Sequence, residues 1–325
     1  MFLKNTLTKV PAYQRYFFAN SSAAFSTRSK YLIETSEVAE LIQRADPKLR
    51  LINASWYLPG AEIDPKVEHE ENRLTEATQY FSIAEIAQPG SDLPNTLPSA
   101  EVFSEHMRAL RIRKDDTIVC YDYVGMFSVA RCAWMLRYFG VQDVRIMNGG
   151  LQKWISEGRP VFKGPYRVGE GLPADGDYSF APVDTSRVVT DISKVHEIAG
   201  KLYNGAKDWQ ITDARAPARF NGEVEEPRNM RAGNITGSIN SPYSALVDKE
   251  TGCLKPDNEL KEVFAKQGVA LSGKNTLHSC GSGVTACIVE LAWNISSGGG
   301  KSAIYDGSWS EYGRFDEPDF SKSKV

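Results

Sequence analysis

The same order of landmarks occurs twice along the 325-residue chain, and this internal repeat limits the possible fold more than any other feature of the sequence. Each landmark ends a short apolar run that is typical of a buried strand. The separation between the two copies of a landmark is nearly constant: 160 residues from Asn53 to Asp213, 158 from Asp122 to Cys280, and 158 from Asn148 to Asp306. Such regular spacing predicts two copies of one domain.

Predicted strands and helices alternate within the first copy, and the second follows the same order. Helices are expected over 38–44, 98–110 and 127–138, and strands over 49–54, 117–122 and 144–147. This alternation predicts an α/β fold of tandem domains, each a mostly parallel sheet flanked by helices. A stretch rich in Gly, Pro and Asp separates the copies. The resulting boundaries are a first domain over 31–163, a linker over 164–185 and a second domain over 186–320.

Cys280 stands in the most distinctive stretch of the second copy, between a strand-like run and a helix expected over 286–294. Gly281 and Gly283 permit a tight loop that directs backbone N–H groups toward the cysteine sulfur. The amino end of the following helix adds its positive dipole end, so the loop favours a thiolate. In the first copy Asp122 takes the equivalent position, which confines thiolate chemistry to the second domain.

The five cysteines are an odd number without paired spacing, which argues against a disulfide framework and against a zinc site. Cys120, Cys132, Cys253 and Cys287 are interpreted as packing residues, the common role of a free cysteine. Packing is also the alternative for Cys280, but it requires neither two nearby glycines nor a helix start. No metal or other cofactor is predicted.

The charge of the chain argues against one class of partner. A net charge of −3 and an isoelectric point near 5.9 show no basic excess, so nucleic-acid binding is not expected. No stretch reaches the roughly 18 to 20 apolar residues that a membrane span needs.

Residues 1–30 differ from the rest of the chain because they carry basic and hydroxyl side chains and no acidic residue. This composition is typical of a mitochondrial targeting segment, and the alternative is a disordered tail that happens to be basic. The expected location is the matrix side of the mitochondrion. The aromatic residues of 1–30 also make this segment a candidate for docking to a larger mitochondrial protein assembly.

Several motifs together resemble the two-domain rhodanese-type sulfurtransferases, and most closely their 3-mercaptopyruvate branch. They run through the chain after the leader, at 54–60, 148–151, 213–215, 219–222, 226–228, 280–285 and 305–309. The resemblance implies a non-catalytic first domain, a catalytic second domain and a persulfide carried on Cys280. It also implies that sulfur passes from a small thiol substrate to an acceptor thiol such as thioredoxin, or to cyanide.

The same resemblance assigns a carboxylate-binding role to two arginines. Arg219 and Arg228 match the arginines that grip the carboxylate of mercaptopyruvate in the family. A planar guanidinium suits this task because it binds a carboxylate through two parallel hydrogen bonds. Without the motif around them, both residues would be interpreted as solvated surface arginines.

The loop after Cys280 supplies the other expected contacts. Ser282 is expected to donate a hydroxyl hydrogen bond to the substrate, and Thr285 to steady the loop or to cap the helix. Gly281, Gly283 and Val284 complete the substrate-binding loop implied by the resemblance.

Neutral residues after Cys280 favour one donor over another. Family members that prefer the dianion thiosulfate tend to place basic side chains there, whereas Gly281 and Ser282 are neutral, so mercaptopyruvate is the expected donor. A phosphatase of related fold needs an arginine six positions after the cysteine, and position 286 is alanine. A cysteine protease needs a histidine base, and His278 is better interpreted as a core or surface residue.

One helper group implied by the resemblance is missing. In the family a first-domain histidine relays a proton with an aspartate and the loop serine; here Asp64 keeps the aspartate, but Arg73 replaces the histidine. Arginine cannot exchange a proton near neutrality, so turnover is expected to be slow. Arg73→His is expected to raise it if Asp64 and Ser282 are positioned to complete the relay. Residues 77–100 also diverge, and their prolines are expected to prevent any regular element.

Two hypotheses follow from these observations. One is an active sulfurtransferase; the other is a weakly active or inactive accessory subunit of a larger mitochondrial complex, built on the same fold. The intact loop around Cys280 favours the enzyme, whereas Arg73 favours the accessory subunit.

Overall fold

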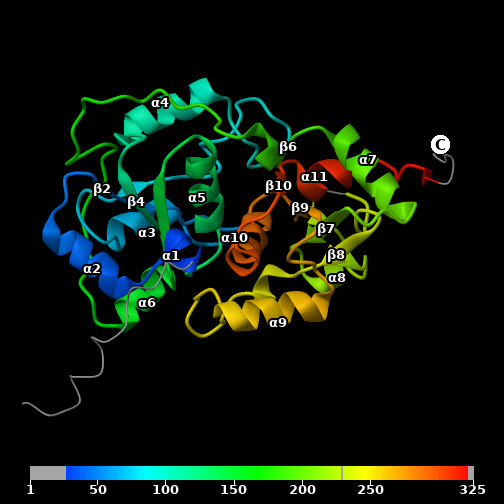
Figure 1. Ribbon diagram of the computed structural model, residues 1–325. Helices are drawn as coiled ribbons and strands as arrows, with labels where there is room; N and C mark the ends of the chain where they lie inside the picture. Colours follow the sequence, from blue (N-terminus) through cyan, green and yellow to red (C-terminus); the bar gives the residue numbers. More distant parts are fainter. Residues whose placement is uncertain (1–26, 228–229, 321–325) are drawn as a thin grey trace, which may run out of the picture.

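The computed structural model describes residues 27–227 and 230–320, which form two five-stranded sheets flanked by helices (Figure 1). The strand order is β1-β5-β4-β2-β3 in the first sheet and β6-β10-β9-β7-β8 in the second. Within both sheets, each strand runs parallel to the strands with which it pairs. Because the second order is the first with each strand number raised by five, the predicted tandem α/β fold is confirmed.

The first domain agrees closely with the predicted elements. Its strands are β1 (Leu32–Ile33), β2 (Leu49–Asn53), β3 (Gln79–Tyr80), β4 (Thr117–Tyr121) and β5 (Asp143–Met147). Its helices are α1 (Thr27–Tyr31), α2 (Thr35–Arg44), α3 (Pro65–Glu71), α4 (Ala100–Leu110), α5 (Val129–Tyr138) and α6 (Gly150–Ser156). One expectation is corrected: the proline-rich stretch 77–100 does contain a regular element, the short strand β3, which pairs with β2.

The second domain repeats this order with small differences in length. Its strands are β6 (Val188–Val189), β7 (Trp209–Asp213), β8 (Ser238–Asn240), β9 (Asn275–Ser279) and β10 (Ser302–Tyr305). Its helices are α7 (Ile192–Tyr203), α8 (Pro217–Phe220), α9 (Asp257–Gln267), α10 (Ala286–Ser297) and α11 (Ser308–Tyr312). Two 3₁₀ turns, η2 (Thr185–Arg187) and η4 (Tyr243–Ala245), accompany them.

The amphipathic pattern of α4 shows why a helix forms there. Ser99 caps the helix by accepting a hydrogen bond from the N–H of Val102 at 3.3 Å. Phe103, Met107 and Leu110 then follow at helical spacing and are buried. The helix therefore buries one apolar face in the hydrophobic core.

Helices α5 and α10 pack against each other between the two sheets (Figure 1). Both are almost wholly buried, and one continuous apolar core contains residues of both domains. Burial on this scale argues against free motion between the domains. The domain interface therefore provides a fixed frame for residues that meet across it.

The end of the predicted leader is folded onto the second domain. Residues 27–30 belong to α1, and Arg28 donates hydrogen bonds to the carbonyls of Leu254 and Lys255 and pairs with Asp257 at 2.9 Å. Residues 1–26, with most of the predicted targeting and docking segment, lie outside the described residues.

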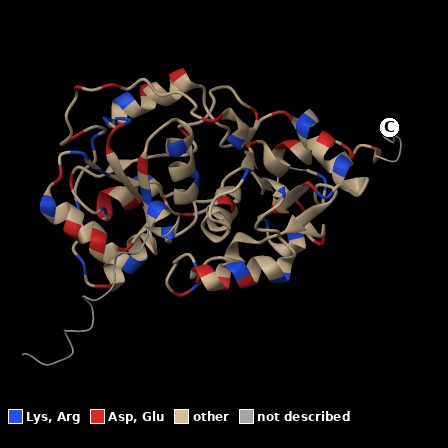
Figure 2. Cartoon of the chain, viewed as in Figure 1, with Lys and Arg blue, Asp and Glu red and all other residues tan. Residues whose placement is uncertain are grey.

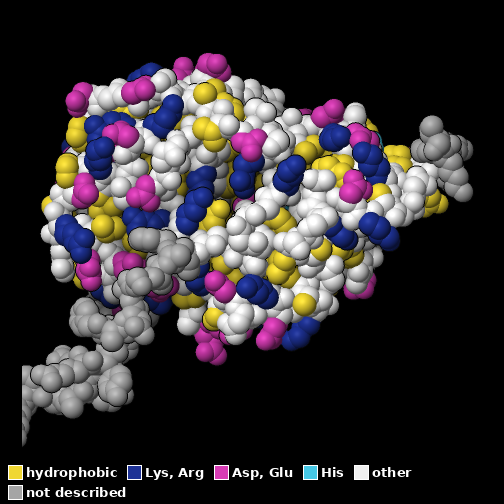
Figure 3. Space-filling model, in the orientation of Figure 1, with side chains coloured by type: hydrophobic (Ala, Val, Ile, Leu, Met, Phe, Trp, Pro, Cys, Tyr) yellow, Lys and Arg dark blue, Asp and Glu magenta, His cyan; other side chains and the backbone are white. Residues whose placement is uncertain are grey.

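Charged side chains of both signs are dispersed over the two domains (Figure 2), and the face shown in Figure 3 mixes them with apolar atoms. Among the described helices, none has the length and apolar character required to cross a bilayer.

Two core histidines generate a prediction about acid stability. Burial lowers the pKa of His69 and of His278 to about 3, because it disfavours the charged imidazolium. The unfolded chain binds protons at these groups below about pH 6.5 while the folded chain does not, so stability falls as pH decreases from 6.5 toward 3. Each histidine should contribute a slope of up to about 1.4 kcal/mol per pH unit.

Urea unfolding of His69→Gln and His278→Gln at pH 7, 6 and 5 measures this contribution. Each variant should lose less stability between pH 6 and 5 than the wild type, whatever its stability at pH 7. A pH slope equal to that of the wild type would contradict the assignment.

Candidate active site

A cavity of about 400 Å³ lies between the two domains, and Cys280 is one of its lining residues. Cys280 directly follows β9 and Ala214 directly follows β7, so the cavity meets the carboxyl ends of the central strands. The Trp56 and Phe127 rings stack with centroids 6.1 Å apart. They belong to an apolar wall that the first domain contributes: Trp56, Leu58, Pro59 and Phe127.

Ser308 holds the loop that follows Cys280. Its hydroxyl oxygen accepts hydrogen bonds from the N–H groups of Cys280 and Gly283, both at 3.1 Å, and its O–H donates to the carbonyl of Tyr305 at 2.8 Å. Gly283 has a φ of +73°, and a Cβ atom there would meet the carbonyl oxygen of Asp306 at 2.8 Å. Position 283 therefore requires glycine for both its backbone conformation and its space.

Other backbone N–H groups of this loop make no hydrogen bond to any residue in the described part of the chain. They belong to residues that line the cavity: Gly281, Ser282, Val284 and Thr285. Helix α10 begins directly after them, with the positive end of its dipole at the loop. Four N–H groups of the predicted nest therefore keep no partner among the described residues, whereas those of Cys280 and Gly283 bind Ser308.

The equivalent loop of the first domain is filled by its own side chain. The carboxylate of Asp122 accepts hydrogen bonds from the N–H groups of Gly125 at 2.6 Å, Phe127 at 2.8 Å and Val129 at 3.1 Å. These N–H groups are therefore not available to an external anion. The first domain contributes a wall of the cavity, and Cys280 belongs to the second domain.

Arg219 lies beside the cysteine loop. A Cβ atom on Gly281 would lie 3.6 Å from Nη2 of Arg219. The buried carboxylate of Glu226 accepts hydrogen bonds from Nε of Arg219 at 3.0 Å, from its Nη2, and from Nη1 of Arg215 at 2.9 Å. Within the described residues Nη1 of Arg219 has no hydrogen-bond partner. Arg228, predicted to bind the same substrate carboxylate, lies outside the described residues.

Comparison with known proteins identifies the family. The Rhodanese-like domain family matches residues 37–157. The 3-mercaptopyruvate sulfurtransferase of Escherichia coli K12 is 37% identical over 275 residues, which cover 82% of this chain and 90% of the relative. The chain belongs to the two-domain rhodanese-type sulfurtransferases. Relatives named thiosulfate sulfurtransferase match at similar identity, so the family alone does not decide the sulfur donor.

Two solved sulfurtransferase structures share the fold. SseA from Escherichia coli, a 3-mercaptopyruvate sulfotransferase, is 32% identical with a TM-score of 0.72. The match covers 87% of this chain and 100% of SseA. The sub-stoichiometric sulfur transferase subunit of yeast mitochondrial complex I is 28% identical with a TM-score of 0.77. The match covers 89% of this chain and 98% of that subunit.

The sulfurtransferase loop places its two hydroxyl residues differently. Ser282 lines the cavity, and its Oγ accepts a 3.2 Å hydrogen bond from the side-chain amide of Asn95 in the first domain. Thr285 also lines the cavity and stands at the N-cap position of α10, but its side chain makes no capping hydrogen bond.

Asp64 and Arg73, the residues of the predicted relay, are not among the residues that line the Cys280 cavity. Asp64 caps α3 by accepting a hydrogen bond from the N–H of Lys66 at 2.8 Å, and it lines a neighbouring hollow. The guanidinium of Arg73 is buried and donates to the carbonyls of Gly164 at 2.7 Å and Pro165 at 2.9 Å. Arg73 therefore holds the start of the interdomain linker.

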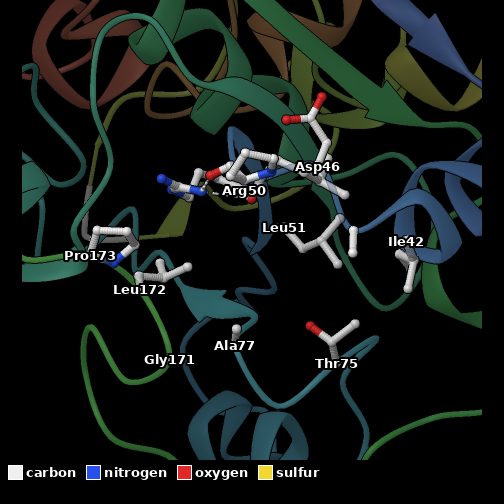
Figure 4. Close-up of a pocket in the computed structure, with 12 residues that line it drawn as sticks. Ile42, Asp46, Arg50, Leu51, Thr75, Ala77, Gly171, Leu172 and Pro173 are labelled. Atoms are coloured by element: carbon white, nitrogen blue, oxygen red, sulfur yellow. Dashed lines mark hydrogen bonds between the residues drawn. The ribbon is translucent and has the colours of Figure 1, made fainter.

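A larger hollow of about 470 Å³ lies at the amino-terminal end of β2 in the first domain (Figure 4). Leu51 and Leu172 form part of its apolar lining. Arg50, also on its wall, is paired with Asp116 at 3.1 Å and donates to the carbonyl of Pro47 at 2.8 Å. Its lining residues include no cysteine, so this hollow offers no thiol chemistry.

Sequence reasoning missed three residues that contact the Cys280 loop. Asn95 and Arg131 of the first domain reach this loop of the second domain, and Ser308 binds two of its N–H groups. Only Ser308 could have been found from the sequence, because it stands within the motif at 305–309. The other two become visible only when the domains are placed together.

The position of Arg73 changes the expected effect of replacing it. Arg73→His removes donors from two partly buried carbonyls, so the free energy of unfolding should fall by on the order of 2 kcal/mol, and sulfur transfer should not become faster. Urea unfolding and turnover measure the two effects. Arg167→His, in the same linker but with an exposed side chain, is the matched control and should change stability by less than about 0.5 kcal/mol. A faster Arg73→His enzyme would show that the family relay is restored.

Proposed function

We propose that this chain is a 3-mercaptopyruvate sulfurtransferase that carries sulfur as a persulfide on Cys280. The observation that supports this most is the cavity itself, where Cys280, unpaired loop N–H groups and the Arg219 guanidinium lie together. Burial raises the pKa of the thiols of Cys132, Cys253 and Cys287, which disfavours a thiolate at those positions.

The reaction has two balanced steps. The Cys280 thiolate attacks the mercaptopyruvate sulfur, an S–S bond forms and the C–S bond breaks. Its electron pair stays on the carbon as pyruvate enolate, which takes up one proton to give pyruvate. An acceptor thiolate, such as that of thioredoxin, then attacks the outer sulfur and releases the Cys280 thiolate, whereas cyanide would leave as thiocyanate.

The residues of the second domain have distinct tasks in this reaction. Arg219 binds the substrate carboxylate through Nη1, with Glu226 holding its orientation, and Arg228 joins it. Ser282 donates its hydroxyl proton to the keto group, and the N–H groups of Gly281 and its neighbours stabilise negative charge. Val284 lines the apolar side of the cavity, and Thr285 steadies the loop through its position at the start of α10.

The absence of basic side chains after Cys280 supports mercaptopyruvate as the donor over thiosulfate. Gly281 is neutral and carries no side chain, and Ser282 turns its oxygen to Asn95. Arg131 and Arg215 are paired with Asp306, Asp213 and Glu226, whereas Nη1 of Arg219 keeps no partner among the described residues. One guanidinium with a free edge suits a monoanionic carboxylate better than a dianionic sulfur donor.

A matrix location and docking to a mitochondrial assembly form the less direct part of the proposal. The composition of residues 1–30 supports targeting, and a relative from Arabidopsis thaliana is named as mitochondrial. The sulfur transferase subunit of yeast complex I shows that a chain of this fold can belong to such an assembly. That resemblance favours a second candidate function, a weakly active accessory subunit.

Intact-mass analysis after incubation with mercaptopyruvate tests the carrier. The wild type should gain one sulfur atom. Cys280→Ser should gain none, because only Cys280 is followed by a loop whose N–H groups can stabilise a thiolate or a persulfide. Cys253→Ser and Cys287→Ser are the matched controls and should gain sulfur like the wild type. Sulfur on Cys253 or Cys287 in the Cys280→Ser protein would refute the assignment, and a wild type that gains none would favour the accessory subunit.

Arg219→Gln tests carboxylate recognition. Loss of a charge-assisted hydrogen bond of roughly 1.5 to 3 kcal/mol should raise KM for mercaptopyruvate about 10- to 150-fold. Arg314→Gln removes a surface arginine that pairs with Asp92 outside the cavity, and should leave KM within twofold of the wild type. An unchanged KM in Arg219→Gln would exclude it as the carboxylate ligand.

A further inference from the structure

The irregular segment before α4 brings an asparagine of the first domain to the catalytic loop. The side-chain amide of Asn95 donates a 3.2 Å hydrogen bond to Oγ of Ser282, and both residues are more than nine-tenths buried. Asn95 has a φ of 58°, a left-handed conformation that asparagine adopts more readily than most residues. The backbone conformation thus holds the amide at this position.

A buried ion pair secures the same segment. Arg131 on α5 donates from Nη2 to the carboxylate of Asp306 at 2.7 Å and to the carbonyl of Asn95 at 2.9 Å. The other carboxylate oxygen of Asp306 accepts from the N–H of Leu97 at 2.8 Å. Nη1 of Arg131 reaches the carbonyl of Gly283 at 3.3 Å, within the catalytic loop. The guanidinium of Arg131 therefore binds both the backbone of Asn95 and the loop that the Asn95 side chain contacts.

We propose that Asn95 is a positioning residue for sulfur transfer, which holds Oγ of Ser282 as an acceptor and thereby directs the Ser282 hydroxyl proton into the Cys280 cavity. A serine oxygen that accepts one hydrogen bond keeps its own O–H for a second partner. No residue in the described part of the chain accepts this proton. The keto oxygen of the bound substrate supplies the acceptor, because it gains negative charge as the C–S bond breaks.

This inference rests on the proposed sulfur transfer and adds to it a residue of the non-catalytic domain. If it is correct, the first domain does more than close the cavity, because it sets the direction of one proton in the second domain. The role differs from the predicted relay through Arg73, since an amide orients the hydroxyl without exchanging a proton itself.

A double-mutant cycle on Asn95 and Ser282 tests the proposal. Asn95→Gly removes the amide and tolerates the left-handed backbone, while Ser282→Ala removes the hydroxyl. Single-turnover persulfide formation at saturating mercaptopyruvate, followed by intact mass, should slow about tenfold in each single variant and no further in the double variant. Losses that multiply in the double variant, or an Asn95→Gly rate within twofold of the wild type, would overturn the proposal.

Two further variants separate the hydrogen bond from general packing. Asn95→Asp keeps the size of the side chain but replaces its donor by a carboxylate, which accepts the Ser282 proton and turns it from the cavity; the rate should again fall about tenfold. A wild-type rate in this variant would contradict the proposal. Thr96→Val is the control, because the Thr96 hydroxyl has no partner among the described residues, and its rate should stay within twofold of the wild type.

Alkylation of Cys280 by 3-bromopyruvate separates this inference from the proposed function. The reaction needs the cysteine and a bound keto acid but no sulfur donor. A wild type that forms no persulfide overturns the proposed function. The alkylation rates of the wild type, Asn95→Gly, Ser282→Ala and the double variant then test Asn95 independently. Non-additive losses in that cycle support the positioning role, and additive losses overturn it.

Discussion

The buried ion pair between Arg131 and Asp306 is the interaction on which the geometry around the Cys280 loop depends. It joins the two domains at 2.7 Å, with both side chains almost without exposure to solvent. Burying two charges costs nearly as much as their attraction returns, so the pair adds little net stability. Removing one partner, by contrast, would leave an uncompensated buried charge. The pair therefore determines position, because it ties the carbonyls of Asn95 and Gly283 to one guanidinium.

The duplication gives the two domains the same architecture but different loops after the fourth strand. Both place a polar residue after the fourth strand of the copy, Asp122 after β4 and Cys280 after β9. The Asp122 carboxylate occupies the N–H groups of its own loop, whereas several N–H groups of the Cys280 loop keep no partner among the described residues. A carboxylate that satisfies its own nest makes a stable wall, and a cysteine that does not leaves room for a substrate anion.

Most of the fold could be predicted because it depends on local patterns. The strands ending at Asn53 and Ser279 and the helix after Cys280 follow from apolar runs, glycines and spacing, and their ends agree with the structure to within a few residues. The cysteine loop was predictable for the same reason. The hydrogen-bond partners of the Arg73 guanidinium were not predictable, because the carbonyls of Gly164 and Pro165 lie 91 and 92 residues further along the chain.

The sequence by itself determined the repeat, the parallel sheets and the neutral loop around Cys280, because each depends on residues that lie close together in the chain. Only the tertiary structure decided which donors meet which acceptors. Asn95 reaches Ser282 across 187 positions, and Glu226 turns Arg219 toward the cavity through a contact that motif spacing does not reveal. A buried polar group must bind whatever partner the fold brings within about 3 Å, and that choice depends on how the two domains pack.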